Sequence, residues 1–182
     1  QLIAGWTTAR RAKFDVSCAA GPWGKSFFIE GVGLGAFTET MSRLDARSNV
    51  DLTDHEDAEK KIQATLHILK VRLEACRALG MKITLDGRDL AGEYVLLEAM
   101  NIRSIGPNLW LAPDADPGDG LLDVVLVPDR ERQRLTDHLT ERTEGKNIFP
   151  QLTTHRGRHL HIECDELRVH IDDDVWPRHG EH

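Results

Sequence analysis

The sequence predicts a mainly β domain with helical insertions, an α+β fold, and three observations support this fold class. Seven or more short segments have the alternation or the composition of strands. Only one segment, 53–80, has the apolar periodicity of a long helix. The 182 residues contain no internal repeat and no convincing linker, so we expect a single β-sandwich-like domain over 1–182.

The N-terminal part predicts the end of a helix, two strands and a short helix. Residues 1–12 read as the tail of a helix that leads in from a preceding lobe, because the chain opens on Gln1 rather than on Met. Segments 13–19 and 26–32 read as strands joined by a turn with Gly and Pro. Residues 38–46 predict a short helix.

The long helix is predicted by its capping and its periodicity. Thr53-Asp54-His55-Glu56 has the form of a capping box, with negative charge in the first turn. Gly80 stands where a left-handed C-terminal cap is expected. Apolar residues recur at steps of three and four and give the helix one apolar face: Ala58, Ile62, Leu66, Leu69, Leu73 and Cys76.

The second half of the chain adds strands and one polar helix. Residues 129–144 are polar and prone to form a helix. Segments 158–164 and 167–172 each alternate, and Asp165-Glu166 between them predicts a terminal hairpin. The other expected strands are 81–85, 93–101, 109–112 and 121–127, the first two separated by a turn at Asp86-Gly87.

Composition narrows the class of protein. A net charge of −7 argues against nucleic-acid binding, because no Lys/Arg cluster is present to neutralise phosphates. No apolar run approaches the length of a membrane span, and no signal peptide is visible. The three cysteines are widely scattered and imply no disulfide framework. We therefore expect a cytoplasmic protein, with at most peripheral contact to a membrane.

The run Gly31-Val32-Gly33-Leu34-Gly35-Ala36 lies between an expected strand and an expected helix, as in a dinucleotide-binding turn. Such a turn needs a second apolar strand that ends in an acidic residue about twenty positions on. Residues 41–51 are polar instead. The glycines therefore favour a strand that bends or that approaches another backbone closely.

A second motif, His159-Leu160-His161-Ile162-Glu163, places two imidazoles and a carboxylate on one strand face. Paired histidines at this spacing can bind zinc. A solvent-facing row opposite the apolar residues is the favoured interpretation.

Carboxylates gather at two places. Asp114, Asp116 and Asp119 lie in a loop that bends at Pro117-Gly118, just before strand 121–127. Hard cations such as Mg²⁺ take carboxylate and carbonyl oxygens, so this loop is either a metal site or a solvated acidic turn.

The second gathering is Asp172-Asp173-Asp174 at the end of the last expected strand. Adjacent carboxylates repel one another, which suits general-base chemistry or metal binding. A simple charged strand end is the alternative.

The order of these motifs resembles the C-terminal domain of the diacylglycerol kinase-like lipid kinases, a group that includes sphingosine, ceramide and bacterial lipid kinases. The most specific matches are Leu111-Ala112-Pro113-Asp114-Ala115 and Asp119-Gly120-Leu121-Leu122-Asp123. The glycine run, the long helix and 94–101 are similar to the family as well. The match closes on Ile171-Asp172-Asp173-Asp174, where the family usually has Val-Asp-Gly-Glu.

The resemblance implies a fold and an activity. The fold is the β-sandwich lobe of the NAD kinase/diacylglycerol kinase-like fold. Its partner lobe carries a Gly-Gly-Asp-Gly-Thr nucleotide loop, which this sequence lacks, so the chain alone is expected to be inactive. ATP binds between the lobes, and its γ-phosphoryl passes to the hydroxyl of a diacylglycerol-like lipid. The implied partners are ATP, the lipid and, transiently, a membrane surface.

The resemblance also implies site residues. Mg²⁺ would be held by the side chain of Asp119, with the carbonyls near Asp116 and Leu121 as further ligands. The general base corresponds to Asp174, with Asp172 supporting it. Phosphoryl transfer depends mostly on positioning and charge stabilisation, which a metal-ordered acidic network can supply.

Departures from the family pattern leave alternatives open. Asp173 replaces the usual Gly and Asp174 the usual Glu, and Ile105-Gly106-Pro107-Asn108 stands where the family has a glycine cluster. A non-catalytic lipid- or nucleotide-binding module that has lost the chemistry is one alternative. An NAD kinase-like enzyme is another, which the two most specific motifs disfavour.

Overall fold

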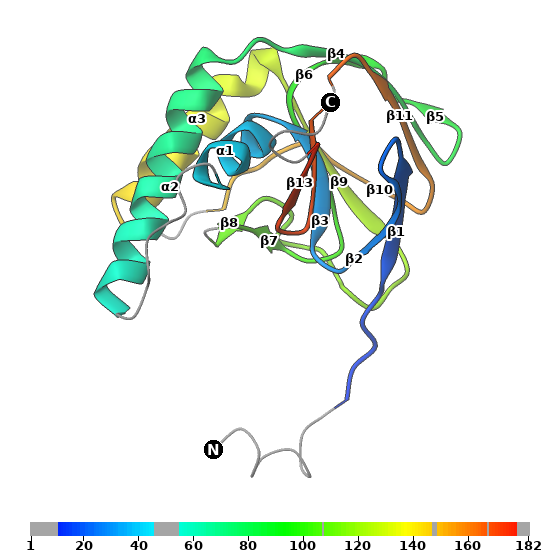
Figure 1. Ribbon diagram of the computed structural model, residues 1–182, viewed down its shortest axis with the longest axis horizontal. Coiled ribbons are helices and arrows are strands. Elements are labelled where there is room, and N and C mark those ends of the chain that lie inside the picture. The colour runs from blue at the N-terminus through cyan, green and yellow to red at the C-terminus, as the bar shows by residue number, and fades with distance from the viewer. Residues whose placement is uncertain (1–10, 46–54, 107, 147–148, 167, 178–182) are drawn as a thin grey trace.

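The computed structural model describes residues 11–45, 55–106, 108–146, 149–166 and 168–177. Within them the fold is mainly β with few helices, as predicted (Figure 1). The strands are β1 (Ser17–Gly21), β2 (Gly24–Phe28), β3 (Gly31–Gly35), β4 (Leu79–Leu85), β5 (Arg88–Asp89), β6 (Gly92–Met100), β7 (Ser104–Ile105), β8 (Leu109–Trp110), β9 (Leu122–Pro128), β10 (Thr154–Gly157), β11 (Leu160–Cys164), β12 (Val169–Ile171) and β13 (Asp174–Trp176). The helices are α1 (Ala36–Asp45), α2 (His55–Ala75) and α3 (Arg132–Thr143), the last preceded by a 3-10 turn, η1 (Asp129–Glu131).

One bent antiparallel sheet forms the body of the domain. Its strands run in the order β10-β9-β6-β3-β12-β13, and β4 pairs with β11, β5 and β6. β6 is the branch point, because its first residues pair with β4 while residues 96–100 pair with β3. The sheet therefore folds over on itself, which produces the sandwich-like architecture.

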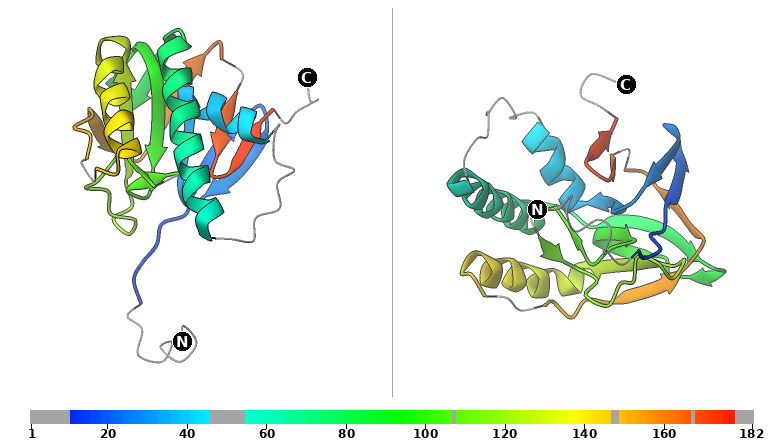
Figure 2. Two further views of the ribbon diagram at one scale, coloured as in Figure 1. Left: turned by 90° about the vertical axis from the view of Figure 1, so that its left-hand side faces the viewer. Right: turned by 90° about the horizontal axis from the view of Figure 1, so that it is seen from below.

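Two apolar clusters fill the two sides of this sheet. One lies between the folded halves and includes Met81, Ile83, Leu97, Val124 and Leu126. The other lies beneath the helices (Figure 2), where α2 packs against α1 and α3. Leu66, Leu69 and Leu73 of α2 and Leu135 and Leu139 of α3 are fully buried there, in agreement with the predicted apolar faces.

The long helix ends earlier than predicted. α2 stops at Ala75, and Gly80 lies within β4 rather than at a helix cap. The reason is a change of period: Leu79, Met81, Ile83 and Leu85 alternate inward, which is the pattern of a strand. The predicted capping residues Thr53 and Asp54 lie outside the described residues, as do residues 1–10 of the predicted helix tail 1–12. Residues 11 and 12 are described and are not helical.

The predicted terminal hairpin is wrong. β11 pairs with β4, and β12 pairs with β3 and β13, so the strands on either side of Asp165-Glu166 are not partners. Alternation tells which face of a strand is buried but not which strand lies next to it. The terminal hairpin is β12–β13, and Asp172-Asp173 form its turn.

The predicted strand 26–32 is divided into β2 and β3. The break falls at Ile29-Glu30. The other predicted elements are present within a few residues of their expected bounds, including the turn at Asp86-Gly87, where both residues have positive φ. The short strands β5, β7, β10 and β13 were not predicted. None of the helices in the described part of the chain is both long and apolar enough to cross a bilayer.

His138 on α3 is a buried histidine whose two ring nitrogens have no hydrogen-bond partner among the described residues. Burial, with the charge of Arg142 adding to it, lowers the pKa of His138 to about 4. A folded-state pKa below the unfolded one means that protonation favours unfolding. The neutral ring therefore gives stability that is complete above about pH 6.5 and is lost as the pH falls toward 4.

We predict that His138→Phe flattens this acid dependence. The difference corresponds to about 3 kcal/mol of unfolding free energy between pH 7 and 4. Urea denaturation of both proteins across this range measures it. His161→Phe, which changes an exposed histidine, is the control. Equal slopes for wild type and His138→Phe would show that His138 does not couple protonation to unfolding.

Candidate functional site

The three glycines of β3 leave one face of that strand without side chains. Val32 and Leu34 pack into the cluster between the sheet halves, so Gly31, Gly33 and Gly35 occupy the helix-facing side. A Cβ on Gly33 would lie 2.2 Å from an oxygen of Glu98, and one on Gly35 would lie 2.4 Å from the carbonyl oxygen of Val95. The close-approach interpretation of the glycine run is confirmed.

Asp172 joins the terminal hairpin to the chain between β2 and β3. Its carboxylate accepts hydrogen bonds from the backbone N–H groups of Ile29 (3.0 Å), Glu30 (2.8 Å) and Gly31 (3.1 Å). Successive N–H groups of a regular strand point in opposite directions, so three of them can reach one carboxylate only where the chain bends. This explains the break in the predicted strand 26–32.

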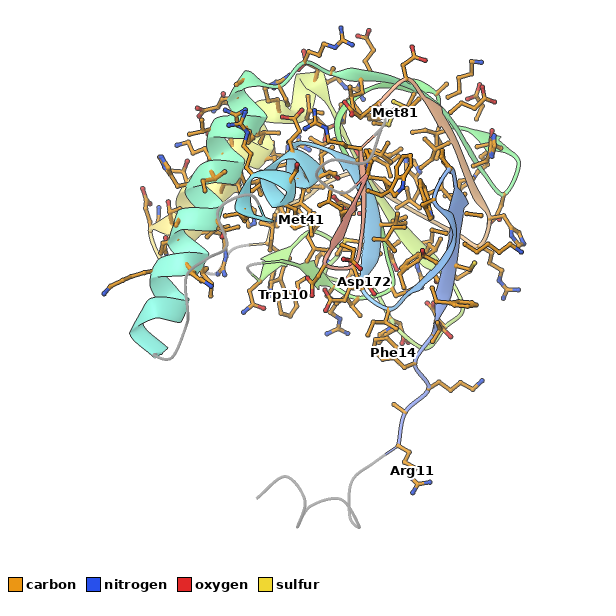
Figure 3. The ribbon with its side chains drawn as sticks, in the orientation of Figure 1. Arg11, Phe14, Met41, Met81, Trp110 and Asp172 are labelled. Atoms are coloured by element: carbon orange, nitrogen blue, oxygen red, sulfur yellow. The ribbon has the colours of Figure 1, made fainter. Side chains whose placement is uncertain are left out.

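A pocket of about 460 Å³ opens beside this turn. Its walls come from the β1–β2 hairpin and the β12–β13 hairpin, and Figure 3 marks Asp172 at the turn of the latter. The rings of Trp23 and Trp176 lie 5.5 Å apart, and Phe27 is 75% exposed. The structure thus brings three carboxylates and an aromatic wall together: Asp172, Asp173, Asp174, Trp23, Phe27 and Trp176.

Negative charge accumulates around this pocket. Burial raises the pKa of Glu30, and the neighbouring Asp173 and Asp172 raise it further, while His170 lowers it. Asp173 and Asp174 are exposed, whereas Asp172 is half-buried. The predicted site residues Asp172 and Asp174 therefore share one acidic pocket, with Asp172 bound to backbone amides.

The acidic loop before β9 is held from several sides. Leu121 N–H donates to Asp119 Oδ1 (2.9 Å), and Gly118 N–H donates to Asp116 Oδ1 (3.0 Å). Asp15 accepts from the N–H of Gly120 (2.6 Å) and donates its own N–H to the carbonyl of Pro117 (2.7 Å). The segment that leads into β1 thus closes the loop.

Arg156 on β10 neutralises part of the loop's charge. Its guanidinium pairs with Asp119 and lies 3.4 Å from Asp123 Oδ1. Burial raises the pKa of Asp123, Arg156 lowers it, and Asp119 and Asp114 raise it. Asp123 Oδ2 is buried and has no hydrogen-bond partner among the described residues. One guanidinium therefore pairs with two carboxylates, and Asp114 adds negative charge near Asp123, so the site stays negative.

The two acidic sites are separate but share a neighbour. The segment from Asp15 through Phe27 contacts the loop at one end and lines the pocket at the other. His159 and His161 belong to neither site. His161 is exposed and lies 3.6 Å from Glu163, which pairs with Lys82, so the solvent-facing interpretation holds. Among the described residues no three His, Cys, Asp or Glu side chains converge to hold a metal.

Comparison with known proteins identifies the domain. Residues 40–179 match a protein family described as the YegS C-terminal NAD kinase beta sandwich-like domain. The chain belongs to this family. Membership confirms the resemblance to the C-terminal domain of diacylglycerol kinase-like lipid kinases.

Several relatives of this YegS-type domain carry the name diacylglycerol kinase. The diacylglycerol kinases of two Mycobacterium tuberculosis strains, CDC 1551 and H37Rv, are each 30% identical over 104 residues, which cover 56% of this chain and 34% of each relative. The chain thus spans about a third of their length. The crystal structure of a Bacillus anthracis diacylglycerol kinase is similar in fold, with a TM-score of 0.57 at 23% identity, over 88% of this chain and 48% of that one.

Sequence reasoning missed the aromatic wall of this YegS-type domain and the partners of its acids. Trp23 and Trp176 are far apart in sequence and meet only in the folded sheet. Asp123 and Arg156 pair across β9 and β10. Glu98 gave a usable signal, since it is the one charged residue in the apolar run 95–100.

We predict that Asp172 stabilises the YegS-type domain. Asp172→Ala removes the acceptor of three backbone N–H groups and should lower the unfolding free energy by about 2 kcal/mol. Asp172→Asn keeps one side-chain oxygen and tolerates the positive φ of 48°, so its loss should be smaller. Urea denaturation measures both. Asp173→Ala, which changes a neighbouring exposed acid, serves as the control. An equal loss of unfolding free energy in Asp173→Ala would contradict the stabilising role of Asp172.

Proposed function

We propose that this chain is the substrate-side lobe of an ATP-dependent lipid kinase, which transfers the γ-phosphoryl group of ATP to the hydroxyl of a diacylglycerol-like lipid. One observation carries the proposal: carboxylates and exposed aromatic rings line the same pocket. A lipid alcohol needs both, an apolar surface for its acyl part and an acceptor for its hydroxyl proton. The names of the mycobacterial and Bacillus relatives support the same substrate class.

The aromatic side of the pocket suits the lipid. The tilted ring pair Trp23–Trp176 and the exposed Phe27 offer a rigid apolar surface next to the acids. Exposed Phe14, Val16 and Ile29 extend apolar surface along the same part of the chain. Together they suit contact with acyl chains at a membrane surface.

The acidic side suits the transfer step. Asp174 is exposed at the start of β13, beside the turn that Asp172 fixes. In the proposed step the Asp174 carboxylate takes the hydroxyl proton while the lipid oxygen forms a bond to Pγ. The bond between Pγ and the bridging oxygen breaks, and ADP leaves with that oxygen. The γ-phosphoryl donor would be bound mainly by a preceding lobe.

The loop before β9 suits a Mg²⁺ ion. Its donors are oxygens, namely the Asp119 carboxylate and the carbonyls near Asp116 and Leu121. The Asp123 oxygen that no described residue binds lies in the same negative cluster. A bound Mg²⁺ would supply positive charge that offsets the negative charge of the cluster and orders the loop. Within the protein, the Leu121 N–H orients Asp119, and Arg156 balances part of the charge.

We predict that Asp174→Asn in the complete protein lowers kcat by about 10²-fold or more, because the amide cannot accept the proton. The assay is transfer of labelled phosphate from ATP to diacylglycerol in mixed micelles. Asp137→Asn, an exposed acid on α3, is the matched control. An unchanged kcat with normal folding would remove Asp174 as the base and favour a non-catalytic binding module.

We predict that Asp119→Ala lowers Mg²⁺ affinity by about tenfold or more. Calorimetric titration of Mg²⁺ into the protein measures binding without reference to turnover, and the same variant should lose the Mg²⁺ dependence of its activity. Asp137→Ala is the control. If Asp119→Ala binds Mg²⁺ as the wild type does, then the loop is not the metal site.

A further inference from the structure

We propose that Glu98 and His170 form a buried positioning pair that fixes the turn carrying the acids of the pocket. The inference rests on the proposed kinase function, in which Asp174 acts from that turn. Neither residue contacts the pocket itself, so their effect passes through Asp172.

Three neighbouring strands place the pair. Gly33 on β3 is the register partner of Glu98 on β6 on one side and of His170 on β12 on the other, so the three residues lie in one row across the sheet. Because Gly33 has no side chain, the two flanking side chains meet above it, with His170 Nε2 2.7 Å from Glu98 Oε2. A Cβ on residue 33 would lie 2.2 Å from the Glu98 carboxylate. Glycine is therefore required between them.

The pair holds the hairpin turn through the second ring nitrogen. His170 Nδ1 lies 3.1 Å from the carbonyl oxygen of Asp172, which can only accept, so Nδ1 donates. Asp172 in turn binds the three N–H groups of residues 29–31. The interaction runs from Glu98 in the sheet interior through His170 and Asp172 to both walls of the pocket.

Both ring nitrogens face oxygen atoms, so one proton must lie between His170 Nε2 and Glu98 Oε2. Burial raises the pKa of Glu98, and His170 partly offsets this. Burial alone would lower the pKa of His170, but Glu98 and Asp172 raise it overall. The pair carries no net charge whichever partner holds that proton.

The fold encloses both side chains of the pair. His170 and Glu98 are 1% and 0% exposed, and the Phe37 ring of α1 meets the imidazole edge-on at 5.1 Å. Besides Glu98, the charged groups that act on His170 are Asp172 and Glu30. Loss of the imidazole therefore frees the Asp172 carbonyl and leaves Glu98 buried without its partner.

The test compares two buried histidines. His170→Phe keeps an aromatic ring but removes both hydrogen bonds, whereas His138→Phe makes the same change at a buried histidine far from the pocket in the chain. Glu98→Gln is the conservative variant, since its amide can donate to Nε2 while Nδ1–H still bonds to Asp172. The first measurement is hydrogen exchange of the amides of Ile29, Glu30 and Gly31 in the complete protein, and the second is kcat and KM for lipid phosphorylation.

We expect His170→Phe to speed exchange at these three amides about tenfold and to lower kcat about tenfold, with little change in KM for ATP. Glu98→Gln should keep most of the wild-type exchange protection and most of the wild-type kcat. His138→Phe should change neither the exchange of these amides nor kcat. Unchanged amide exchange in His170→Phe would overturn the positioning pair, whatever the activity.

Faster exchange of these amides in His170→Phe with an unchanged kcat would overturn the role of the Glu98–His170 pair in the reaction. If the wild-type protein phosphorylates no lipid, the proposed function fails, and the exchange data alone then decide whether the pair positions the turn. If His170→Phe does not fold, the same exchange measurement is made on Glu98→Ala. This variant leaves the imidazole and its hydrogen bond to Asp172 in place. Faster exchange there supports coupling through Glu98, and unchanged exchange contradicts it.

Discussion

A strand face without side chains is the constraint on which the rest of this structure depends. Gly31, Gly33 and Gly35 point toward the helices from the middle of the sheet. Their missing side chains give room for Glu98 to reach His170 and for the backbone of β6 to approach β3. Any larger residue at position 33 would separate the pair that underlies the terminal hairpin. The glycines thus act in the packing between strands.

The two acidic sites compensate their charge in different ways. At the hairpin, Asp172 is satisfied by backbone amides, which carry no net charge and leave the pocket negative. At the loop, Asp119 and Asp123 share a guanidinium, and one buried oxygen of Asp123 has no hydrogen-bond partner in the described part of the chain. The first arrangement fixes geometry, because amide positions follow from the fold. The second leaves negative charge at the loop, which favours a cation.

Local patterns in the sequence predicted the elements but not all of their neighbours. The periodicity of α2 and the apolar runs of β6 and β9 were sufficient, because burial of one face imposes a repeat. The pairing of β11 with β4 was not predictable, since alternation in both strands is equally compatible with a local hairpin. The end of α2 was misplaced because Gly80 fits a cap and a strand alike.

The candidate site divides in the same way. The acids Asp119, Asp172 and Asp174 were predicted because each belongs to a short motif of consecutive residues. The aromatic wall, Arg156 and the Glu98–His170 pair join residues from distant strands, and no spacing rule relates them. Of these residues, Glu98 alone carries a signal that the sequence contains, as a carboxylate within an apolar run whose burial requires a partner, and it was not singled out.

The place of β12 between β3 and β13 has a consequence for synthesis in the cell. β3 is translated early, yet its partner on that side is made only when residues 168–177 leave the ribosome. Until then the edge of β3 is open, and the indole pair cannot form. Nascent or prematurely terminated chains therefore expose an unpaired edge to chaperones, and the pocket is among the last features to assemble.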